Sequence, residues 1–187
     1  MEEEMAKQLI RQYFKGDQGA LEALINENLS PVYNFIYHYV RNSSDAEDIT
    51  QEVFIKMWRS LRKFDQKKNF RTWLFTIAKN TAIDYSRKKK DIPMSSFDDE
   101  EGNNPILDNL SDPSPLPEEL FERKDLAEKL DRAMEQLSPN YRSVLVLYYK
   151  DGFNFREIAE ILGEPIDTIK SRHRRALIKL KEILISY

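Results

Sequence analysis

Five polar side chains close to the C-terminus have the chemistry that binds nucleic acid. They fall within residues 170–175 and are Lys170, Ser171, Arg172, Arg174 and Arg175. Ammonium and guanidinium groups neutralise phosphates, and an arginine can donate two parallel hydrogen bonds to the edge of a guanine. At 100° per residue, Lys170, Ser171 and Arg174 point away from the apolar side of a helix, with Arg175 on one flank and Arg172 nearer the core edge. Contact with phosphates and base edges is therefore the chemistry expected here.

Two helices joined by a tight turn must position these residues. Asn154 can cap the first helix, with Glu157 three residues on, as in a capping box. Gly163 ends that helix, and Pro165 suits the first turn of the second, where a missing N–H costs nothing. The residues expected to be buried are Ile158, Ala159, Leu162, Ile169, Ala176, Leu177 and Leu180. This is the layout of a helix-turn-helix, whose second helix enters the major groove. The alternative is an ordinary amphipathic hairpin with a solvated basic face.

A second polar face lies on a helix expected after residues 42–44. Ser44 can cap this helix, and Glu47 can close a capping box. Its inward residues are expected to be Ile49, Val53, Met57 and Leu61, whereas the opposite side carries Asp48, Gln51, Glu52 and Arg59. On residue types alone, that side is more simply a solvated helix face than a binding surface.

A third face combines an aromatic ring with basic groups. On a helix expected over Phe70–Arg87, the side away from the core carries Trp73, Asn80, Asp84 and Arg87, and the basic run 87–90 closes the helix. A tryptophan in this setting can stack on an unpaired base. It can equally cap the edge of the core, and a basic run also suits the C-terminal end of a helix dipole. The residue pattern leaves both interpretations open.

Composition divides the chain into three parts. Residues 1–90 and 123–187 are each mildly basic, whereas residues 91–122 carry ten acidic side chains, no lysine or arginine, and five of the eight prolines. We expect that stretch to be a flexible acidic linker, because high charge and proline oppose packed structure. There is no cysteine, which is consistent with a cytoplasmic protein and excludes a disulfide framework. No apolar run approaches membrane-spanning length, and the acidic N-terminus is unlike a secretory signal.

The predicted fold class is all-α, with two small helical domains on either side of the linker. Glycine is scarce, and no apolar–polar alternation persists long enough for strands. In the first domain, helices are expected over 5–15, 18–28 and 31–40, followed by the two described above. In the second domain they are expected over 118–137, 139–150, 154–162 and 166–184.

The order of these features resembles the extracytoplasmic-function (ECF) sigma factors of bacterial RNA polymerase. The resemblance rests on DAEDITQEVFIKMWRSLRKFD (45–65) followed by FRTWLFTIAKNTAIDYSRKKK (70–90), and on LSPNYRSVLVLYYKDGFNFREIAEILGEPIDTIKSRHRRALIKLK (137–181). It covers nearly the whole length of the chain. It implies that residues 1–90 are region 2, which binds core polymerase and the promoter −10 element, and that residues 123–187 are region 4, which binds the −35 element.

The resemblance also implies roles for particular residues and partners. Asp48, Gln51 and Glu52 match the helix that docks on the clamp coiled coil of the largest polymerase subunit, and the flap is a second expected contact. The residues that match the −10 and single-strand surface are Lys67, Asn69, Trp73, Asn80, Arg87 and Lys88. The helix carrying residues 170–175 matches the reader of the −35 element. An anti-sigma protein is a further expected partner, and the expected location is the bacterial cytoplasm without membrane insertion.

Two positions depart from the family pattern, so the promoter sequence cannot be borrowed from a relative. Asp167 stands where many relatives have glycine, and Arg174 stands where many have an apolar or aromatic residue. Catalytic residues, cofactors and metal ligands are not expected, and the two histidines, His38 and His173, are expected to be structural. A polymerase-independent helix-turn-helix regulator is the main alternative, and an enzyme acting on nucleic acid would need a constellation that we do not find.

Overall fold

The computed structural model describes residues 2–90 and 117–185, and within these ranges every regular element is helical. The N-terminal half contains α1 (Glu2–Phe14), α2 (Gln18–Val40), α3 (Ser43–Ser60), the short η1 (Leu61–Lys63) and α4 (Phe70–Lys90). The C-terminal half contains α5 (Pro117–Glu135), α6 (Pro139–Leu145), the π-helical turn η3 (Val146–Lys150), α7 (Phe155–Leu162) and α8 (Ile166–Ile185). The all-α prediction is confirmed. Residues 91–116 of the predicted linker lie outside the described residues, whereas residues 117–122 belong to α5.

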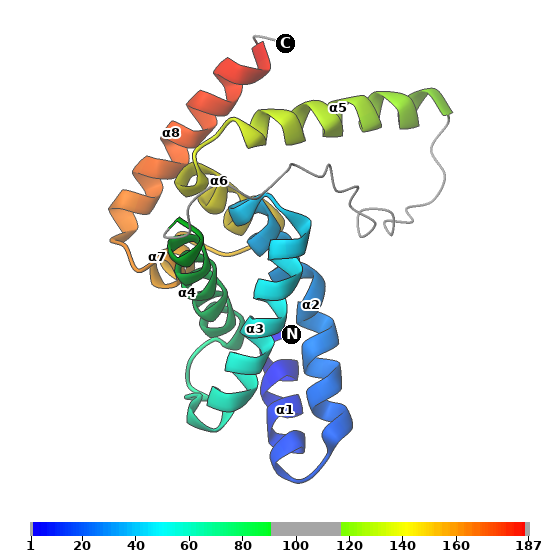
Figure 1. Cartoon of the computed structure of the whole chain (residues 1–187), viewed down its shortest axis with the longest axis vertical. Helices are drawn as coiled ribbons and strands as arrows, with labels where there is room; N and C mark the ends of the chain where they lie inside the picture. The colour runs from blue at the N-terminus through cyan, green and yellow to red at the C-terminus, as the bar shows by residue number, and fades with distance from the viewer. Residues whose placement is uncertain (1, 91–116, 186–187) are drawn as a thin grey trace.

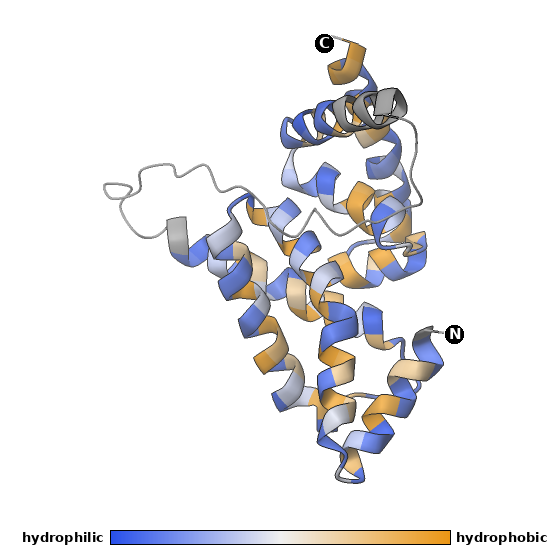
Figure 2. Cartoon of the chain, turned by 90° about the vertical axis from the view of Figure 1, so that its right-hand side faces the viewer, coloured by the Kyte–Doolittle hydropathy of each residue, from blue (hydrophilic) through white to orange (hydrophobic). Residues whose placement is uncertain are grey.

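The first four helices form one packed unit, with α2 and α3 side by side and α1 against the lower part of α2 (Figure 1). Each helix alternates apolar and polar segments rather than being apolar all round (Figure 2). The predicted inward stripe of α3 is confirmed, because Ile49, Val53, Met57 and Leu61 are all buried. This stripe fixes which side of α3 is left exposed, and it therefore orients the acidic residues on the opposite side.

The prediction of separate helices at 18–28 and 31–40 is wrong, because α2 runs unbroken through Pro31. A proline inside a helix removes one N–H donor and crowds the preceding turn. Residues on both sides of it, including Leu24, Val32 and Ile36, are buried against the neighbouring helices. That burial favours continuing the helix, and it outweighs the single lost hydrogen bond.

The N-terminal cap of α3 also differs from the prediction. Asn42, not Ser44, is the N-cap: its side-chain oxygen accepts a hydrogen bond from the backbone N–H of Asp45 at 2.8 Å. The Asp45 carboxylate in turn accepts a hydrogen bond of 2.8 Å from the Tyr85 hydroxyl on α4. This contact ties the start of α3 to α4, which favours beginning the helix at Ser43.

Buried residues lie on more than one side of α4. Phe70, Leu74 and Ala78 are buried on one side of the helix, and Phe75 and Ala82 are buried on another. The reason is that α4 packs against α3 on one side and against α7, from the C-terminal half, on the other (Figure 1). Its burial is a tertiary effect that a single amphipathic stripe does not encode.

The two halves of the chain therefore share an apolar core. The main buried cluster joins residues of α1–α4 with Val144, Leu147, Phe153, Ile158 and Ile169, whereas a second, smaller cluster joins α5, α6 and α8. Phe153 meets Phe75 edge to face, with the ring centroids 4.9 Å apart. The first helix of the helix-turn-helix is thus held by the N-terminal unit.

Candidate nucleic-acid interface

The predicted turn between α7 and α8 is present with its capping residues. Asn154 accepts from the backbone N–H of Glu157 at 3.1 Å, and the Glu157 carboxylate accepts from the backbone N–H of Asn154 at 2.9 Å. This capping box is confirmed. Gly163 ends α7 with φ 68°, in the left-handed region that glycine adopts without strain. Pro165 lies just before α8, and its carbonyl accepts the first hydrogen bond of that helix, from the N–H of Ile169.

The basic side chains of α8 lie mostly where the pattern predicts. Lys170, Ser171, Arg174 and Arg175 are exposed, whereas Ile169 and Ala176 are buried on the other side of the helix. Arg175 donates a 2.7 Å hydrogen bond to the Ser171 hydroxyl one turn earlier. Lys170 lies 3.5 Å from the carboxylate of Asp167. The exposed donors therefore form one continuous polar surface along the first half of α8.

The predicted buried stripe of α8 is partly wrong. Leu177 is 37% exposed, and Leu180 is only partly buried. The inward residues beyond Ile169 are Ala176 and Ile183, about two and four turns further along. Leu177 lies next to Ala176 but is turned by about 100°, which takes it off the line that faces α5 and α6.

Arg172 does not belong to the exposed set. Its guanidinium donates two hydrogen bonds to the carboxylate of Glu164 in the turn, one from Nη1 at 2.9 Å and one from Nη2. The side chain of Arg172 is only 16% exposed. The expected position near the core edge is correct, but the group is already paired within the protein.

His173 is a packing residue, as expected. Its ring lies against Tyr148 and Phe155, with centroid separations of 4.9 Å and 5.2 Å, and it is stacked with Tyr149 at 5.6 Å. Burial lowers the pKa of His173 below its usual value, which favours the neutral ring at neutral pH. This aromatic group fastens the middle of α8 to η3 and α7.

Trp73 lies at the edge of the core and has packing partners there. Its ring is 4.9 Å from that of Phe64 and 5.8 Å from that of Phe70, measured between centroids, and it is partly buried. The core-edge interpretation therefore holds in this structure, and stacking on a base remains a prediction. Further along α4, Asn80, Arg87 and Lys88 are exposed.

The loop before α4 holds one predicted residue in a structural role. Asn69 accepts a 2.9 Å hydrogen bond from the backbone N–H of Thr72, which caps the start of α4. The adjacent N–H of Phe70 is satisfied from another element, since it donates 3.0 Å to the carboxylate of Glu3 on α1. Lys67 is exposed, and its backbone N–H donates 3.0 Å to Asp65. An asparagine just before an apolar helix was the sequence signal for this cap.

The acidic side of α3 is exposed, as predicted. Asp48, Gln51 and Glu52 all lie on it, and Glu52 forms a 2.8 Å ion pair with Lys56 one turn later. Two large apolar residues share this exposed region and were missed from the sequence: Ile55 is 48% exposed and Trp58 is 51% exposed. The sequence signal was that Ile55 and Trp58 follow Gln51 by four and seven residues, a spacing that puts all three on one side of a helix. Exposed apolar side chains beside charged ones are a mark of protein-binding surfaces.

Buried titratable groups lie between the two halves of the molecule. The pKa of His38 on α2 is lowered to about 4, mainly by burial and then by the charges of Lys150 and Arg41. Burial raises the pKa of Asp151 to about 7, against the opposing effect of Arg71 and Lys150. These groups belong to the packing of the halves and are not part of the exposed faces described above.

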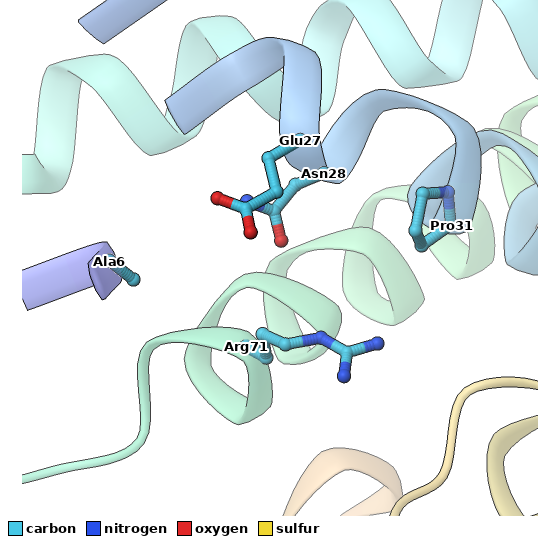
Figure 3. A pocket seen from close by; sticks show the side chains of 5 residues that line it. All are labelled: Ala6, Glu27, Asn28, Pro31 and Arg71. Atoms are coloured by element: carbon cyan, nitrogen blue, oxygen red, sulfur yellow. The ribbon is translucent and has the colours of Figure 1, made fainter. Parts of the chain in front are cut away.

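A pocket between α1, α2 and α4 lies apart from these faces. It is lined by Ala6 of α1, by Glu27, Asn28 and Pro31 of α2, and by Arg71 of α4, whose guanidinium extends away from the Glu27 carboxylate (Figure 3). No predicted site residue lines it. Within residues 2–90 and 117–185 there is also no cluster of side chains suited to a metal ion, and no helix long and apolar enough to cross a membrane.

Comparison with known proteins identifies the family. The sequence profile of Sigma-70 region 2 matches residues 24–92, and that of Sigma-70 region 4 matches residues 127–180. The ECF RNA polymerase sigma factor SigW of Bacillus subtilis is 36% identical over 186 residues, which cover 97% of this chain and 98% of SigW. This chain belongs to the ECF sigma factors of RNA polymerase. The ECF sigma-E factor of Escherichia coli K12 is 34% identical, covering 94% of this chain and 93% of that protein.

Solved sigma factors have the same fold. RpoE from Bartonella quintana, in its complex with the anti-sigma factor NepR, aligns with a TM-score of 0.69 at 26% identity, over 87% of this chain and 95% of RpoE. CnrH in complex with the cytosolic domain of CnrY aligns with a TM-score of 0.66 over 97% of this chain and 98% of CnrH, and at 23% identity this shows the fold alone. The protein is a sigma factor, and hence a non-enzymatic factor of transcription initiation.

Proposed function

We propose that this sigma factor divides promoter recognition among three helices. In this division, α8 reads the −35 duplex, α4 and the loop before it hold the melted −10 strand, and the acidic side of α3 binds core polymerase. One observation carries the assignment of α8. Its exposed donors, Lys170, Ser171, Arg174 and Arg175, form one surface on a capped helix-turn-helix in a chain that belongs to the sigma factors.

The division of energy follows from the chemistry of the faces. Phosphate contacts by α8 supply most of the affinity for duplex DNA, and a bidentate arginine–guanine pair adds about 1–3 kcal/mol of discrimination. Extruding a base costs a few kcal/mol, and stacking on an aromatic ring returns about 1–3 kcal/mol. These two terms nearly cancel. The free protein therefore opens DNA poorly, and core polymerase supplies the missing contacts.

The acidic side of α3 is proposed to bind protein rather than water alone. Its supporting feature is the pairing of Asp48 and Glu52 with the exposed apolar side chains Ile55 and Trp58. An acidic surface with apolar anchors fits a basic helical partner, and the proposed partner is the clamp coiled coil of the largest polymerase subunit. A cytoplasmic location belongs to the same proposal, because the polymerase acts there.

The packing of α4 against α7 limits what the free protein can do. Elements at −35 and −10 are about 25 base pairs apart, which is about 85 Å of duplex at about 3.4 Å per base pair. Helix α8 has 20 residues, so its length is about 30 Å. Because α4 packs on α7, and α7 is joined to α8 by a tight turn, α4 and α8 lie too close together to bind both elements at once. We propose that core polymerase separates the two halves of the molecule and sets the distance between them.

An anti-sigma partner is proposed from the similarity to RpoE of Bartonella quintana, whose structure was solved with the anti-sigma factor NepR. A protein of this kind would hold the sigma factor away from core polymerase. The proposal requires a protein that binds the purified chain and blocks transcription by core polymerase and this chain in a reconstituted reaction. Binding without inhibition would contradict it.

Transcription in vitro tests the proposed function. Purified chain is combined with core polymerase on a library of genomic fragments, and the transcript ends are mapped. The expected result is initiation at sites that share an upstream and a downstream motif. If the chain instead binds particular duplexes with the same affinity whether or not core polymerase is present, the result would support a polymerase-independent regulator.

A further inference from the structure

The guanidinium of Arg172 is engaged at the turn of the helix-turn-helix. It makes a two-pronged contact with the Glu164 carboxylate, and the exposed fractions of the two side chains are 16% and 32%. Helical side chains lean toward the N-terminal end of their helix, which directs Arg172 back over the first turn of α8. Glu164 itself is fixed, because its backbone N–H donates 3.0 Å to the carbonyl of Ala159 in α7. The ion pair therefore joins the start of α8 to the end of α7.

The other cations of this face are held differently. The side chain of Lys170 is 54% exposed, and its partner Asp167 is 90% exposed. Arg175 bonds only within its own helix, to Ser171. Arg174 is exposed, and it makes no hydrogen bond or ion pair with any residue in the described part of the chain. These three side chains can turn toward DNA without breaking a link between elements.

Moving Arg172 to a phosphate has an electrostatic cost that the other cations avoid. The move would leave the carboxylate of Glu164 partly buried and unpaired. That carboxylate would then lie near the DNA backbone and repel it. The next residue, His173, is also committed to the protein interior through its contacts with Tyr148 and Phe155.

We infer that Arg172 is a positioning residue, which sets the angle of α8 through Glu164 and makes no DNA contact of its own. Together with His173 it forms an anchoring pair, flanked by the reading residues at 170–171 and 174–175. This inference rests on the proposed function of α8 as the reader of duplex DNA. It narrows the five predicted −35 residues to four readers and one anchor.

The first test is the salt dependence of DNA binding. The full-length wild-type chain is used to select duplexes from a random pool, and the affinity of each variant for a selected and a scrambled duplex is then measured against salt. Loss of one phosphate contact makes the negative slope of log affinity against log salt shallower by about 0.9. We expect Arg172→Ala to leave the slope unchanged but to reduce the selected-to-scrambled affinity ratio about tenfold, as loss of a base contact would. A slope reduced by about 0.9 for Arg172→Ala would overturn the inference.

The sharper test is Glu164→Gln, because the two roles predict opposite outcomes. If Arg172 contacted DNA directly, removing the acidic group beside it would strengthen binding to every duplex. If the ion pair positions α8, Glu164→Gln weakens discrimination as Arg172→Ala does. Glu182→Gln is the matched control, since Glu182 pairs with Lys179 on the exposed far end of α8. Tighter and equally selective binding by Glu164→Gln would contradict the positioning role.

A charge exchange separates this inference from the proposed function. The double variant Glu164→Arg/Arg172→Glu keeps the pair and reverses its order, so we expect it to recover most of the lost discrimination. Continued loss, with the fold intact by circular dichroism, would count against positioning. If the wild-type chain selects no duplex at all, the proposed function has failed. The ion pair is then still tested by a double-mutant cycle of unfolding with Glu164→Gln and Arg172→Ala, where additive effects would refute it.

Discussion

Arg142 shows how a single side chain can join the two halves of this protein. Its buried guanidinium donates to the carbonyls of Met134, Glu135 and Leu137, which closes the C-terminal end of α5, and donates 2.7 Å to the carbonyl of His38 on α2. Burial, and then the charge of Arg41, lowers the pKa of Arg142 to about 10, so it remains protonated at neutral pH. No sequence pattern predicted this residue, because its acceptors are backbone atoms of distant segments.

The Trp73 ring is both a packing group at the core edge and the proposed stacking platform for a base. Trp73→Ala removes a ring that packs on Phe64 and Phe70 but is only partly buried, so we expect a loss of stability of about 1–3 kcal/mol. It also removes the proposed stacking platform, so promoter opening should fall about tenfold or more. Permanganate footprinting measures opening, and a pull-down measures core polymerase binding. Trp73→Phe keeps part of the packing and serves as the control. Equal loss of opening and of polymerase binding would argue against the assigned role.

Asp151 carries a prediction about pH. Its folded-state pKa, raised to about 7 by burial, exceeds the model-peptide value of 3.8, so the folded protein binds this proton more tightly than the unfolded chain. Stability from this group is therefore present at low pH and is lost as pH rises through the window from about 4 to about 7. Lowering of the His38 pKa to about 4 acts in the opposite direction, since stability falls as pH drops below about 6.5.

Asp151→Asn isolates the first of these effects. Between pH 5 and pH 8, the variant should gain about 2–3 kcal/mol of unfolding free energy relative to the wild type. Urea unfolding at the two pH values measures this difference. Asp84→Asn, at an exposed position on α4, is the matched control. The same pH response in Asp151→Asn and in the wild type would show that Asp151 does not titrate as described.

Among the elements, the acidic side of α3 gives a prediction about partner binding. Asp48→Lys and Glu52→Lys each reverse a charge on the proposed polymerase-binding surface, and each should weaken core binding about tenfold or more without unfolding the chain. Surface plasmon resonance with core polymerase measures the affinity, and thermal unfolding checks the fold. Glu22→Lys reverses an exposed charge on α2 and should have little effect. Unchanged polymerase binding by the α3 variants would show that this face is solvated and does not bind core polymerase.

How far the sequence predicts the elements depends on where their determinants lie. Local chemistry gave the capping box at Asn154 and the turn at Gly163, because cap and turn residues act within a few positions. Pro31 and Ser44 misled the prediction, since burial of α2 and the contact between Asp45 and Tyr85 decide those two places. In the candidate site, exposure followed helical periodicity, whereas the ion pair of Arg172 depended on the position of Glu164 across the turn.

At the scale of the whole molecule, the contact between the two halves is the feature with functional consequences. Arg71 of α4 donates 3.2 Å to the carbonyl of Asp151, and its guanidinium lies 5.1 Å from the centre of the Phe153 ring. Arg142 on α6 is bonded to α2, and Arg41 at the end of α2 forms a 2.7 Å ion pair with Glu135 of α5, so polar contacts at several places join the halves beside the shared apolar core. The proposed separation of the halves on the promoter requires these contacts to break. Their strength therefore sets how much of the polymerase-binding energy is used in opening the sigma factor.

Distance measurements test this opening. The chain has no cysteine, so Ser44→Cys and Arg132→Cys place one dye on each half, at exposed positions within three residues of the Arg41–Asp131 ion pair and away from the proposed DNA-reading residues. Energy transfer should be high in the free protein and should fall when core polymerase is added. Two dyes within the N-terminal half, at Lys15→Cys and Glu22→Cys, provide the control. Unchanged transfer between the halves in an active holoenzyme would contradict the proposed separation.

Strand opening at a promoter tests the central claim most directly. Permanganate reactivity of thymines is measured on one promoter fragment, obtained from the transcription library, with the chain alone, with core polymerase alone and with both together. We expect reactive thymines near −10 only when both are present. Reactive thymines with the chain alone, or none when both are present, would contradict it.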